Sequence, residues 1–391
     1  MSEKSLKPEI RFAGFTENWE QHKAGEIFLT TTDKNHPELP VLSASQEYGM
    51  IKRDEAGINI YHDKRNETTY KRVLPGQFVI HLRSFQGGFA HSTIEGITSP
   101  AYTVLDFIER EKNYDFFWKY ILNSELFVKR LETVTYGIRD GRSISYEDFT
   151  AMKFSYPDYD EQHKIGLFFK RLDNLITLHQ RKCEKLVNFK KAMLEKMFPK
   201  DGTDMPEIRF AGFTGAWEQR KLGDVVLITM GQSPDGNTYS NTPTNYILVQ
   251  GNADLKSGWV TPRVWTSQVT KKAEVGDLIM SVRAPAGAMG KTAYNVVIGR
   301  GVAAIKGNEF IFQSLVKMNM EGYWTKISCG STFESLNSDD IKNAELMIPT
   351  LNEQIRIGLF FNSLDNLLTL QQRELEQLKQ IKKSLLDKMF V

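Results

Sequence analysis

The chain has 391 residues, of which 41% are hydrophobic and 25% charged, a composition typical of a globular protein with room for two domains rather than a disordered chain. The formal net charge of +2 neither requires nor excludes a polyanionic partner. No apolar run approaches the roughly 20 residues that span a membrane. The two cysteines, Cys183 and Cys329, lie outside any metal-ligand spacing, so we expect a cytoplasmic protein without a metal site.

The first recognisable segment is PEIRFAGFT at 8–16, which returns letter for letter at 206–214. The likeness continues to residues 25 and 223, and it places Trp19 opposite Trp217. A repeated segment predicts a repeated structural unit.

The next segment, about 25–155, mixes β-like runs with helical ones. QFVIHL (77–82) follows a PGQ turn, and 114–132 predicts one helix. We therefore expect a mixed α+β globule here.

Residues 161–198 predict a long amphipathic helix, because apolar residues recur at spacings of threes and fours. The stripe consists of Ile165, Phe169, Leu172, Ile176, Cys183, Leu186, Met193 and Met197. At 1.5 Å per residue the helix would measure about 55 Å, too long to be covered by one small globule. Its stripe therefore needs another helix.

The second half repeats this order after a connector with Pro, Gly and Asp. A second globule contains the β-like runs 244–251 and 277–283 and a helical run at 310–327. Residues 353–390 then align with 161–198 without a gap, with 23 of 38 positions identical. The second stripe consists of Ile357, Phe361, Leu364, Leu368, Leu375, Leu378, Ile381, Leu385 and Met389.

The predicted fold class is α+β: two pseudo-repeated globules are joined by two long antiparallel helices that form a coiled-coil spacer. The predicted boundaries are a first globular domain at 1–158, a first helix at 159–198, a linker at 199–205, a second globular domain at 206–350 and a second helix at 351–391.

His179 and Gln371 are polar positions within the two apolar stripes, near the middle of each helix. Antiparallel pairing would bring them close together. Our hypothesis is that they set the register of the pair, as single buried polar residues can. The alternative is that each is a partly exposed seam residue without a special role.

The globules themselves have little sequence in common, although LPGQFVIHLRS (74–84) resembles EVGDLIMSVRA (274–284) and places Arg83 opposite Arg283. Two unlike inserts in one repeated frame suggest one shared mechanical role and two separate recognition roles. Cationic and amide side chains in glycine-containing loops suit base edges and phosphates. The candidate DNA-binding residues are Arg83, Ser84, Gln86, Arg139, Arg142, Arg263, Arg283 and Lys291.

The sequence contains no familiar catalytic motif, so we predict no catalytic residue. PAGAMGKT (285–292) resembles a phosphate-binding loop, but Pro285 stands where that pattern requires glycine and has no N–H to offer.

Together, PEIRFAGF, VGDLIMSVRAP, SPAYTVL (99–105) and the duplicated LFFxxLDNLxTL helix resemble the specificity subunit of type I restriction-modification systems. The resemblance covers nearly the whole chain. It implies two target recognition domains that each read one half of a bipartite sequence in double-stranded DNA, joined by helices that measure the spacer. Because the globules differ, we expect unlike half-sites.

The resemblance also implies that catalysis resides in partners: two DNA methyltransferase subunits that use S-adenosylmethionine, and restriction/translocase subunits that use ATP and Mg. No cofactor is expected in this chain. Two other classes remain open at the level of sequence. A non-enzymatic coiled-coil scaffold would explain the helices, and an enzyme acting alone is suggested only by PAGAMGKT.

Overall fold

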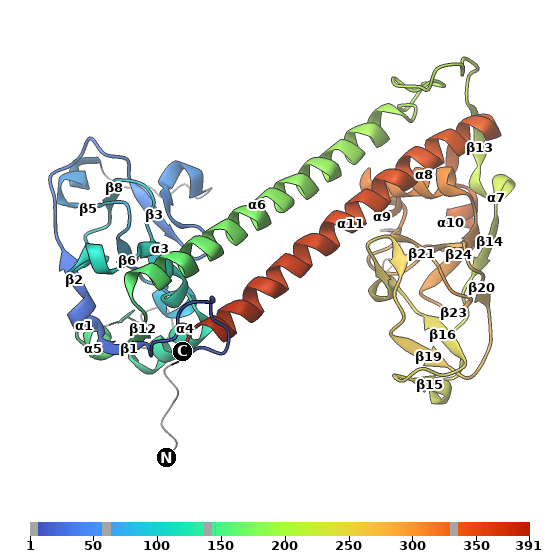
Figure 1. The fold of residues 1–391 in the computed structure, drawn as a ribbon. Helices are drawn as coiled ribbons and strands as arrows, with labels where there is room; N and C mark the ends of the chain where they lie inside the picture. The colour runs from blue at the N-terminus through green and yellow to red at the C-terminus, as the bar shows by residue number, and fades with distance from the viewer. Residues whose placement is uncertain (1–6, 57–63, 137–142, 145, 329–334) are drawn as a thin grey trace. The chain divides into compact units, whose positions relative to one another are not determined.

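The computed structural model describes residues 7–56, 64–136, 143–144, 146–328 and 335–391. The chain forms two compact units. Unit 1 comprises Met1–Leu178 and Leu375–Val391, and unit 2 comprises His179–Glu374. The two long helices, α6 (Tyr159–Lys196) and α11 (Leu351–Met389), each contribute to both units (Figure 1). The predicted boundaries between globular domains, linker and helices stay a prediction.

Unit 1 combines a four-stranded sheet, ordered β2-β9-β6-β7, with short strand pairs and helices. The sheet consists of β2 (Phe28–Thr31), β9 (Thr103–Phe107), β6 (Phe78–Ile80) and β7 (Ala90–His91). The strand pairs are β1 (Glu20–Lys23) with β12 (Lys153–Tyr156), β3 (Leu42–Ser45) with β4 (Gly49–Lys52), β5 (Lys71–Val73) with β8 (Gly96–Thr98), and β10 (Thr135–Tyr136) with β11 (Ser143–Ile144). The shorter helices are α1 (Ala24–Ile27), α2 (Ser84–Gly87), α3 (Asp115–Ile121), α4 (Glu125–Thr133) and α5 (Tyr146–Ala151).

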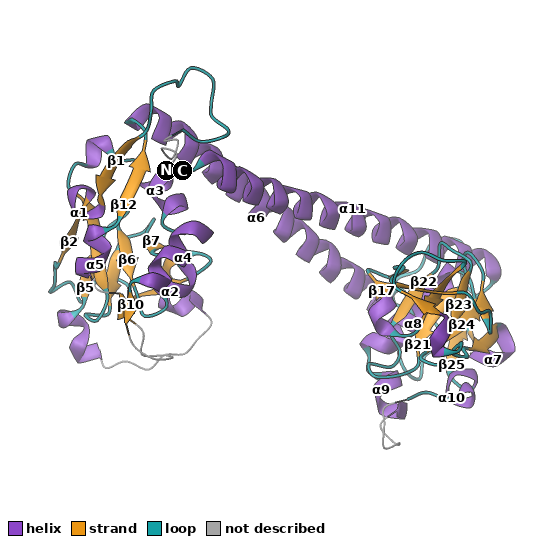
Figure 2. Ribbon diagram, turned by 90° about the horizontal axis from the view of Figure 1, so that it is seen from below, coloured by secondary structure: helices purple, strands orange, loops and turns teal. Residues whose placement is uncertain are grey.

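Unit 2 also combines sheets with short helices, and its sheets have more strands. Figure 2 distinguishes its strands from its helices by colour. The six-stranded sheet consists of β14 (Leu227–Met230), β24 (Val302–Lys306), β21 (Leu278–Ser281), β22 (Met289–Lys291), β18 (Trp259–Val260) and β17 (Leu255–Lys256). The five-stranded sheet consists of β15 (Tyr239–Ser240), β19 (Val264–Thr266), β16 (Tyr246–Val249), β23 (Val296–Ile298) and β20 (Lys272–Ala273). Strand β13 (Glu218–Lys221) pairs with β25 (Glu345–Ile348). The shorter helices are α7 (Leu222–Val225), α8 (Glu309–Met320), α9 (Tyr323–Ser328) and α10 (Ser338–Lys342).

The turn before β6 and the turn before β21 are built alike. Gly76 and Gly276 both adopt positive φ, at 87° and 92°, which favours glycine. In each turn a side chain accepts a backbone N–H three residues earlier: Gln77 from Leu74, and Asp277 from Glu274. The faint sequence similarity at 74–84 and 274–284 thus corresponds to one shared turn and strand.

Two predicted helices are each broken into two, which corrects the sequence-based boundaries. The run 114–132 divides into α3 and α4 because Ser124 caps the second helix, with its Oγ accepting from the N–H of Phe127. The run 310–327 divides into α8 and α9 at Gly322, whose φ of 74° ends a helix readily.

The two long helices pack antiparallel in both units, as the sequence predicts. In unit 1, Asp173 early in α6 lies 2.6 Å from Lys382 late in α11, measured Oδ1 to Nζ. In unit 2, Lys190 late in α6 lies 2.6 Å from Asp365 early in α11. Cys183, expected in the apolar stripe, is buried. Ile381 is instead 49% exposed, because the next residue, Lys382, is the one that faces Asp173.

Each unit has its own apolar core, rich in aromatic residues. Trp19, Phe117 and Trp118 are buried in unit 1, and Phe310 and Trp324 are buried in unit 2. Among the helices of the described residues, none has the length and apolar character needed to cross a membrane.

Candidate nucleic-acid interface

The repeated PEIRFAGFT segment joins the start of one long helix to the end of the other in each unit. In unit 1 the Arg11 guanidinium donates to both oxygens of Glu161, at 2.6 and 2.7 Å, and Glu161 is fully buried. The N–H of Ile10 donates to the carbonyl of Lys388 at 3.0 Å. Such bidentate pairing is directional as well as strong. The segment therefore holds both long helices at once.

The Arg11–Glu161 pair and the Ile10–Lys388 hydrogen bond together form a clamp on the two helices, and unit 2 repeats this clamp at the equivalent residues. Arg209 donates to both oxygens of the buried Glu353, again at 2.6 and 2.7 Å. The N–H of Ile208 donates to the carbonyl of Lys196 at 2.8 Å. The nine identical residues thus make the same contacts with the long helices in both units.

An aromatic contact closes each unit beside the clamp. In unit 1, Trp19 packs against Phe390, which follows α11, with ring centroids 6.4 Å apart. In unit 2, Trp217 packs against Phe198, which follows α6, at 5.9 Å. Each globule is therefore closed by the end of the helix that belongs to the other copy of the repeat.

Near the middle of the helices, His179 and Gln371 approach the same carboxylate oxygen. The amide of Gln371 donates to Oε2 of Glu374 at 2.7 Å, and Nδ1 of His179 lies 3.7 Å from that oxygen. Gln371 is 4% exposed, whereas the His179 side chain is 19% exposed. Glu374 thus brings together the two polar positions that the sequence singles out, and their role in register stays a prediction.

In unit 1, three of the predicted DNA-binding residues lie after β6, but only two face solvent. Arg83 and Gln86 are exposed. Ser84 is fully buried, and its Oγ accepts the N–H of His81 at 2.8 Å. Ser84 therefore stabilises the turn that presents Arg83, and its side chain is not available to DNA.

His81 is uncharged at neutral pH in this turn. Burial, and to a smaller extent the neighbouring Arg83, lower its pKa to about 4. The N–H of Arg83 donates to Nδ1 of His81 at 3.2 Å. A neutral imidazole that accepts this bond helps to hold the backbone of Arg83.

In unit 2, the predicted contacts also divide into exposed and internally bonded residues. Arg283 follows β21 and is exposed, and among the described residues it forms no ion pair. Arg263 is half exposed, but its Nε donates to the buried Asp254 at 2.8 Å. Arg139 and Arg142 lie outside the described residues.

Lys291 is buried, which contradicts its predicted place on a DNA-binding surface. Its Nζ lies 2.8 Å from Glu309 and 4.9 Å from the ring centroids of both Trp259 and Phe312. An internally paired ammonium under two rings cannot reach a phosphate, so the resemblance of 285–292 to a phosphate-binding loop has no structural counterpart here. Among the described residues, no group of three or more His, Cys, Asp or Glu is placed to hold a metal ion.

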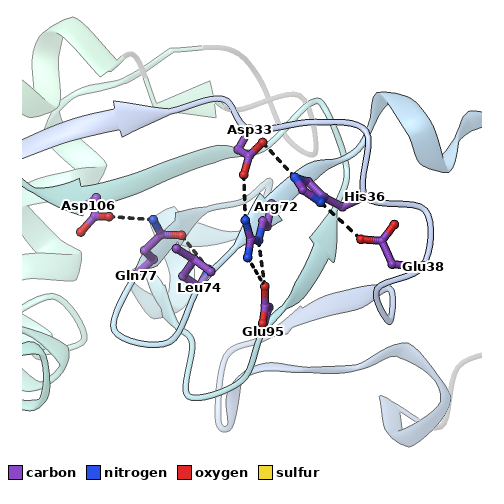
Figure 3. Close-up of polar contacts among 8 residues, drawn as sticks. All are labelled: Asp33, His36, Glu38, Arg72, Leu74, Gln77, Glu95 and Asp106. Carbon is purple, nitrogen blue, oxygen red and sulfur yellow. Dashed lines mark hydrogen bonds and ion pairs between the residues drawn. The ribbon is translucent and has the colours of Figure 1, made fainter.

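A polar network orders the loop after β2 in unit 1 (Figure 3). Arg72 pairs with Glu95 at 2.5 Å and with Asp33 at 3.2 Å, and His36 lies 3.0 Å from Asp33. Hydrogen bonding with His36, and then with Arg72, holds the pKa of Asp33 below its ordinary value. Two carboxylates neutralise Arg72, so the network shapes the loop and offers no free cation.

The sequence analysis missed the Arg11–Glu161 and Arg209–Glu353 clamps. A signal for them existed, because Arg11 and Arg209 are matching polar positions that are identical in the two copies, and so are Glu161 and Glu353. Identical polar residues in a duplicated frame indicate contacts within the frame.

Comparison with known proteins gives one consistent family. The family model described as type I restriction modification DNA specificity domain matches residues 17–188 and again 215–380. A relative in Methanocaldococcus jannaschii, named for the MjaX type I restriction enzyme specificity subunit, is 27% identical over 258 residues, covering 63% of this chain. The MjaVIII specificity subunit of the same organism is 22% identical over 261 residues, covering 61% of this chain. These matches span 60% and 61% of the relatives' own lengths.

Solved structures show the same fold. The type I restriction-modification S subunit from M. genitalium superposes with a TM-score of 0.68 at 14% identity, covering 99% of both chains. A chain from a study of complex assembly and conformational transition in a type I system superposes with a TM-score of 0.54 at 23% identity, covering 95% of this chain and 97% of that one.

Proposed function

Because this chain belongs to the family of type I restriction modification DNA specificity domains, we propose that it is the DNA-recognition subunit of such a system. In this role it binds double-stranded DNA and performs no catalysis itself. The observation that carries the proposal is the presence of two units with the same clamp and unlike globules, each with an exposed arginine after the equivalent strand. These arginines are Arg83 and Arg283.

Each globule would read one half of a bipartite target. An exposed arginine beside a turn suits bidentate bonding to guanine or contact with a phosphate. The neighbouring exposed side chains differ: Gln86 lies three residues after Arg83, whereas Pro285 lies two residues after Arg283. Two differently lined loops favour two different half-sites.

The paired helices would set the spacer between the half-sites. Each is one uninterrupted element, of 38 residues in α6 and 39 in α11. A matched deletion of seven residues from the middle of both helices preserves the heptad face and removes about 10 Å, roughly three base pairs of duplex. We expect the permitted spacer to shorten while both half-sites keep their bases.

The partners would be two methyltransferase subunits, docking at equivalent places on the two units, and restriction/translocase subunits. Each long helix leaves large apolar residues exposed outside its seam: Leu351, Ile355 and Leu359 on α11, and Leu175 and Leu178 on α6. Such unpaired faces indicate partner contact. S-adenosylmethionine, ATP and Mg would be bound by those partners, and the complex would act on DNA in the cytoplasm.

The decisive test is methylome sequencing of cells that express this chain together with its modification subunit. A bipartite methylated motif that disappears when the chain is omitted is the expected result. If an active modification subunit gives no chain-dependent motif, the chain is not the specificity subunit.

A further inference from the structure

One aspartate in each unit bonds to three different elements. In unit 2, Oδ2 of Asp365 on α11 accepts the amide of Gln313 from α8 at 2.8 Å, and its Oδ1 accepts Lys190 from α6 at 2.6 Å. Gln313 is fully buried. Asp365 therefore links a helix of the globule to both long helices.

The equivalent aspartate in unit 1 makes the equivalent junction. Oδ2 of Asp173 on α6 accepts the hydroxyl of Tyr120 from α3 at 2.7 Å, and lies 3.4 Å from Nζ of Lys119. Its Oδ1 lies 2.6 Å from Lys382 on α11. Asp173 matches Asp365 in the repeat, and Lys190 matches Lys382, so both units use the same two frame residues.

In unit 2 the junction continues into the globule as a chain of bonded side chains. Gln313 also donates to Oε1 of Glu309 at 2.9 Å, and Oε2 of Glu309 pairs with the buried Lys291 on β22. The bonded side chains lie in turn on β22, α8, α11 and α6. A strand of the central sheet is thereby connected to the paired helices through directional, charge-assisted bonds.

The globule helices α3 and α8 also lie close to the long helices α6 and α11, at a glycine two turns before each aspartate. A Cβ added at Gly166 would lie 2.7 Å from the backbone N of Phe117, and one added at Gly358 would lie 3.0 Å from Cβ of Glu309. The glycine therefore permits the close approach. The hydrophobic effect is non-directional, so directional polar bonds restrict the orientation of a helix further than apolar burial does.

We infer that Asp173 and Asp365 are positioning residues, each of which sets the orientation of its recognition globule on the helix pair and so sharpens the DNA spacer that the protein accepts. This inference rests on the proposed function. As positioning residues, the aspartates do not contact DNA themselves. They act through the helices α3 and α8, to which they are bonded.

The test is the spacer distribution of methylated sites in cells that express Asp365→Asn or Asp173→Asn in the full chain with its modification subunit. Asparagine keeps the shape and removes the charge that Lys190 or Lys382 requires. We expect unchanged half-site bases and an increase of about tenfold in methylation at sites whose spacer differs by one base pair, the scale of coupling within one polar network. Glu274→Gln, which breaks the exposed Lys306 pair inside globule 2, is the matched control and should leave the spacer unchanged.

The purified variants are first compared with the wild type by thermal unfolding. If Asp365→Asn does not fold, Gln313→Leu provides the test, because it removes the hydrogen bonds from Gln313 to Asp365 and Glu309 and keeps the Asp365 pair with Lys190. A folded variant with the wild-type spacer distribution overturns the inference, as does a change in half-site bases. Absence of any motif with the wild-type chain would instead refute the proposed function.

Discussion

In unit 1 the hairpin strand β7 contributes His91 to a pair with Asp115 on α3, whereas in unit 2 strand β22 contributes Lys291 to a pair with Glu309 on α8. The two pairs occupy the same place in the two globules, next to the hairpin partners Phe78 and Leu278. The globules have therefore kept the location of a polar bond and changed both of its members.

Outside the globules the two units differ much less. Arg11 and Arg209 bind Glu161 and Glu353 at the same two distances, and Ile10 and Ile208 donate to equivalent helix ends. A clamp that holds two helices admits few alternatives, because its buried carboxylate needs a bidentate cation. The contrast shows that the duplication preserved the way each unit closes and allowed the recognition surfaces to diverge.

The largest effect should come from breaking a clamp. Arg11→Ala and Arg209→Ala each leave a buried glutamate unpaired, which costs about 3–5 kcal/mol of unfolding free energy. Urea unfolding should show similar losses for the two variants if the clamps are equivalent. Lys383→Ala, which removes an exposed pair with Glu125, is the control and should leave the midpoint unchanged. A marked difference between the two clamp variants would contradict the equivalence of the two units.

The second effect should distinguish the units by pH. His81 has a pKa of about 4 in the folded protein against an ordinary value of 6.5, whereas unit 2 has Ser281 at the matching position. Because the unfolded chain binds the proton more tightly than the folded protein, the free energy of unfolding falls as the pH drops from 6.5 to 4. The loss over this range is about 3 kcal/mol, and the full contribution is present above pH 6.5. Burial also lowers the pKa of His91, so unit 1 has a second group with the same sign.

His81→Ser, which introduces the residue of unit 2, should remove this part of the acid sensitivity. The measurement is the urea midpoint between pH 7 and pH 4 for the wild type and the variant. Equal slopes for the two proteins would show that His81 is not held neutral by burial.

The frame could be predicted from the sequence because repetition and apolar spacing are local signals. The antiparallel helices follow from two stripes of matching length, and the units follow from two copies of one segment. The breaks at Ser124 and Gly322 were missed because each lies within a strongly apolar run, where a cap or a positive φ overrides the pattern. Ile381 was wrongly assigned to the apolar stripe of α11, because the next residue, Lys382, is the one that faces Asp173 on α6.

The site was less predictable than the frame. Arg83, Ser84 and Lys291 all stand in polar, glycine-containing stretches, yet only Arg83 is exposed. The partner that buries Lys291 is Glu309, 18 residues further along the chain, and nothing in the local sequence indicates that pairing. Burial within a loop depends on long-range partners, so loop composition alone cannot separate a DNA contact from an internal bond.

The third effect concerns the two exposed arginines and should be confined to one half-site each. Arg83→Ala and Arg283→Ala in the complex with the modification subunit should each weaken binding to the target by about tenfold to a hundredfold. Competition with duplexes altered in either half-site would show relaxed discrimination at one half-site per variant. Arg220→Ala, on the exposed frame strand β13, is the control. Uniform weakening on all sequences would identify the arginine as a phosphate contact instead.

The smallest effect should come from the centre of the helices, where the two copies differ at matching positions. His179 and Gln371 both approach Oε2 of Glu374, so each should matter less once the other is removed. A double-mutant cycle with His179→Leu and Gln371→Leu should give a coupling of about 0.5 kcal/mol in unfolding free energy. Gln371→Leu alone places an apolar side chain in a buried seam where the amide Oε1 had no hydrogen-bond partner among the described residues, so it should not destabilise strongly. Additive single effects would show that the two residues share a neighbour without specifying the register, which would then depend on the repeated contacts, the clamps and the Asp173–Lys382 and Lys190–Asp365 pairs.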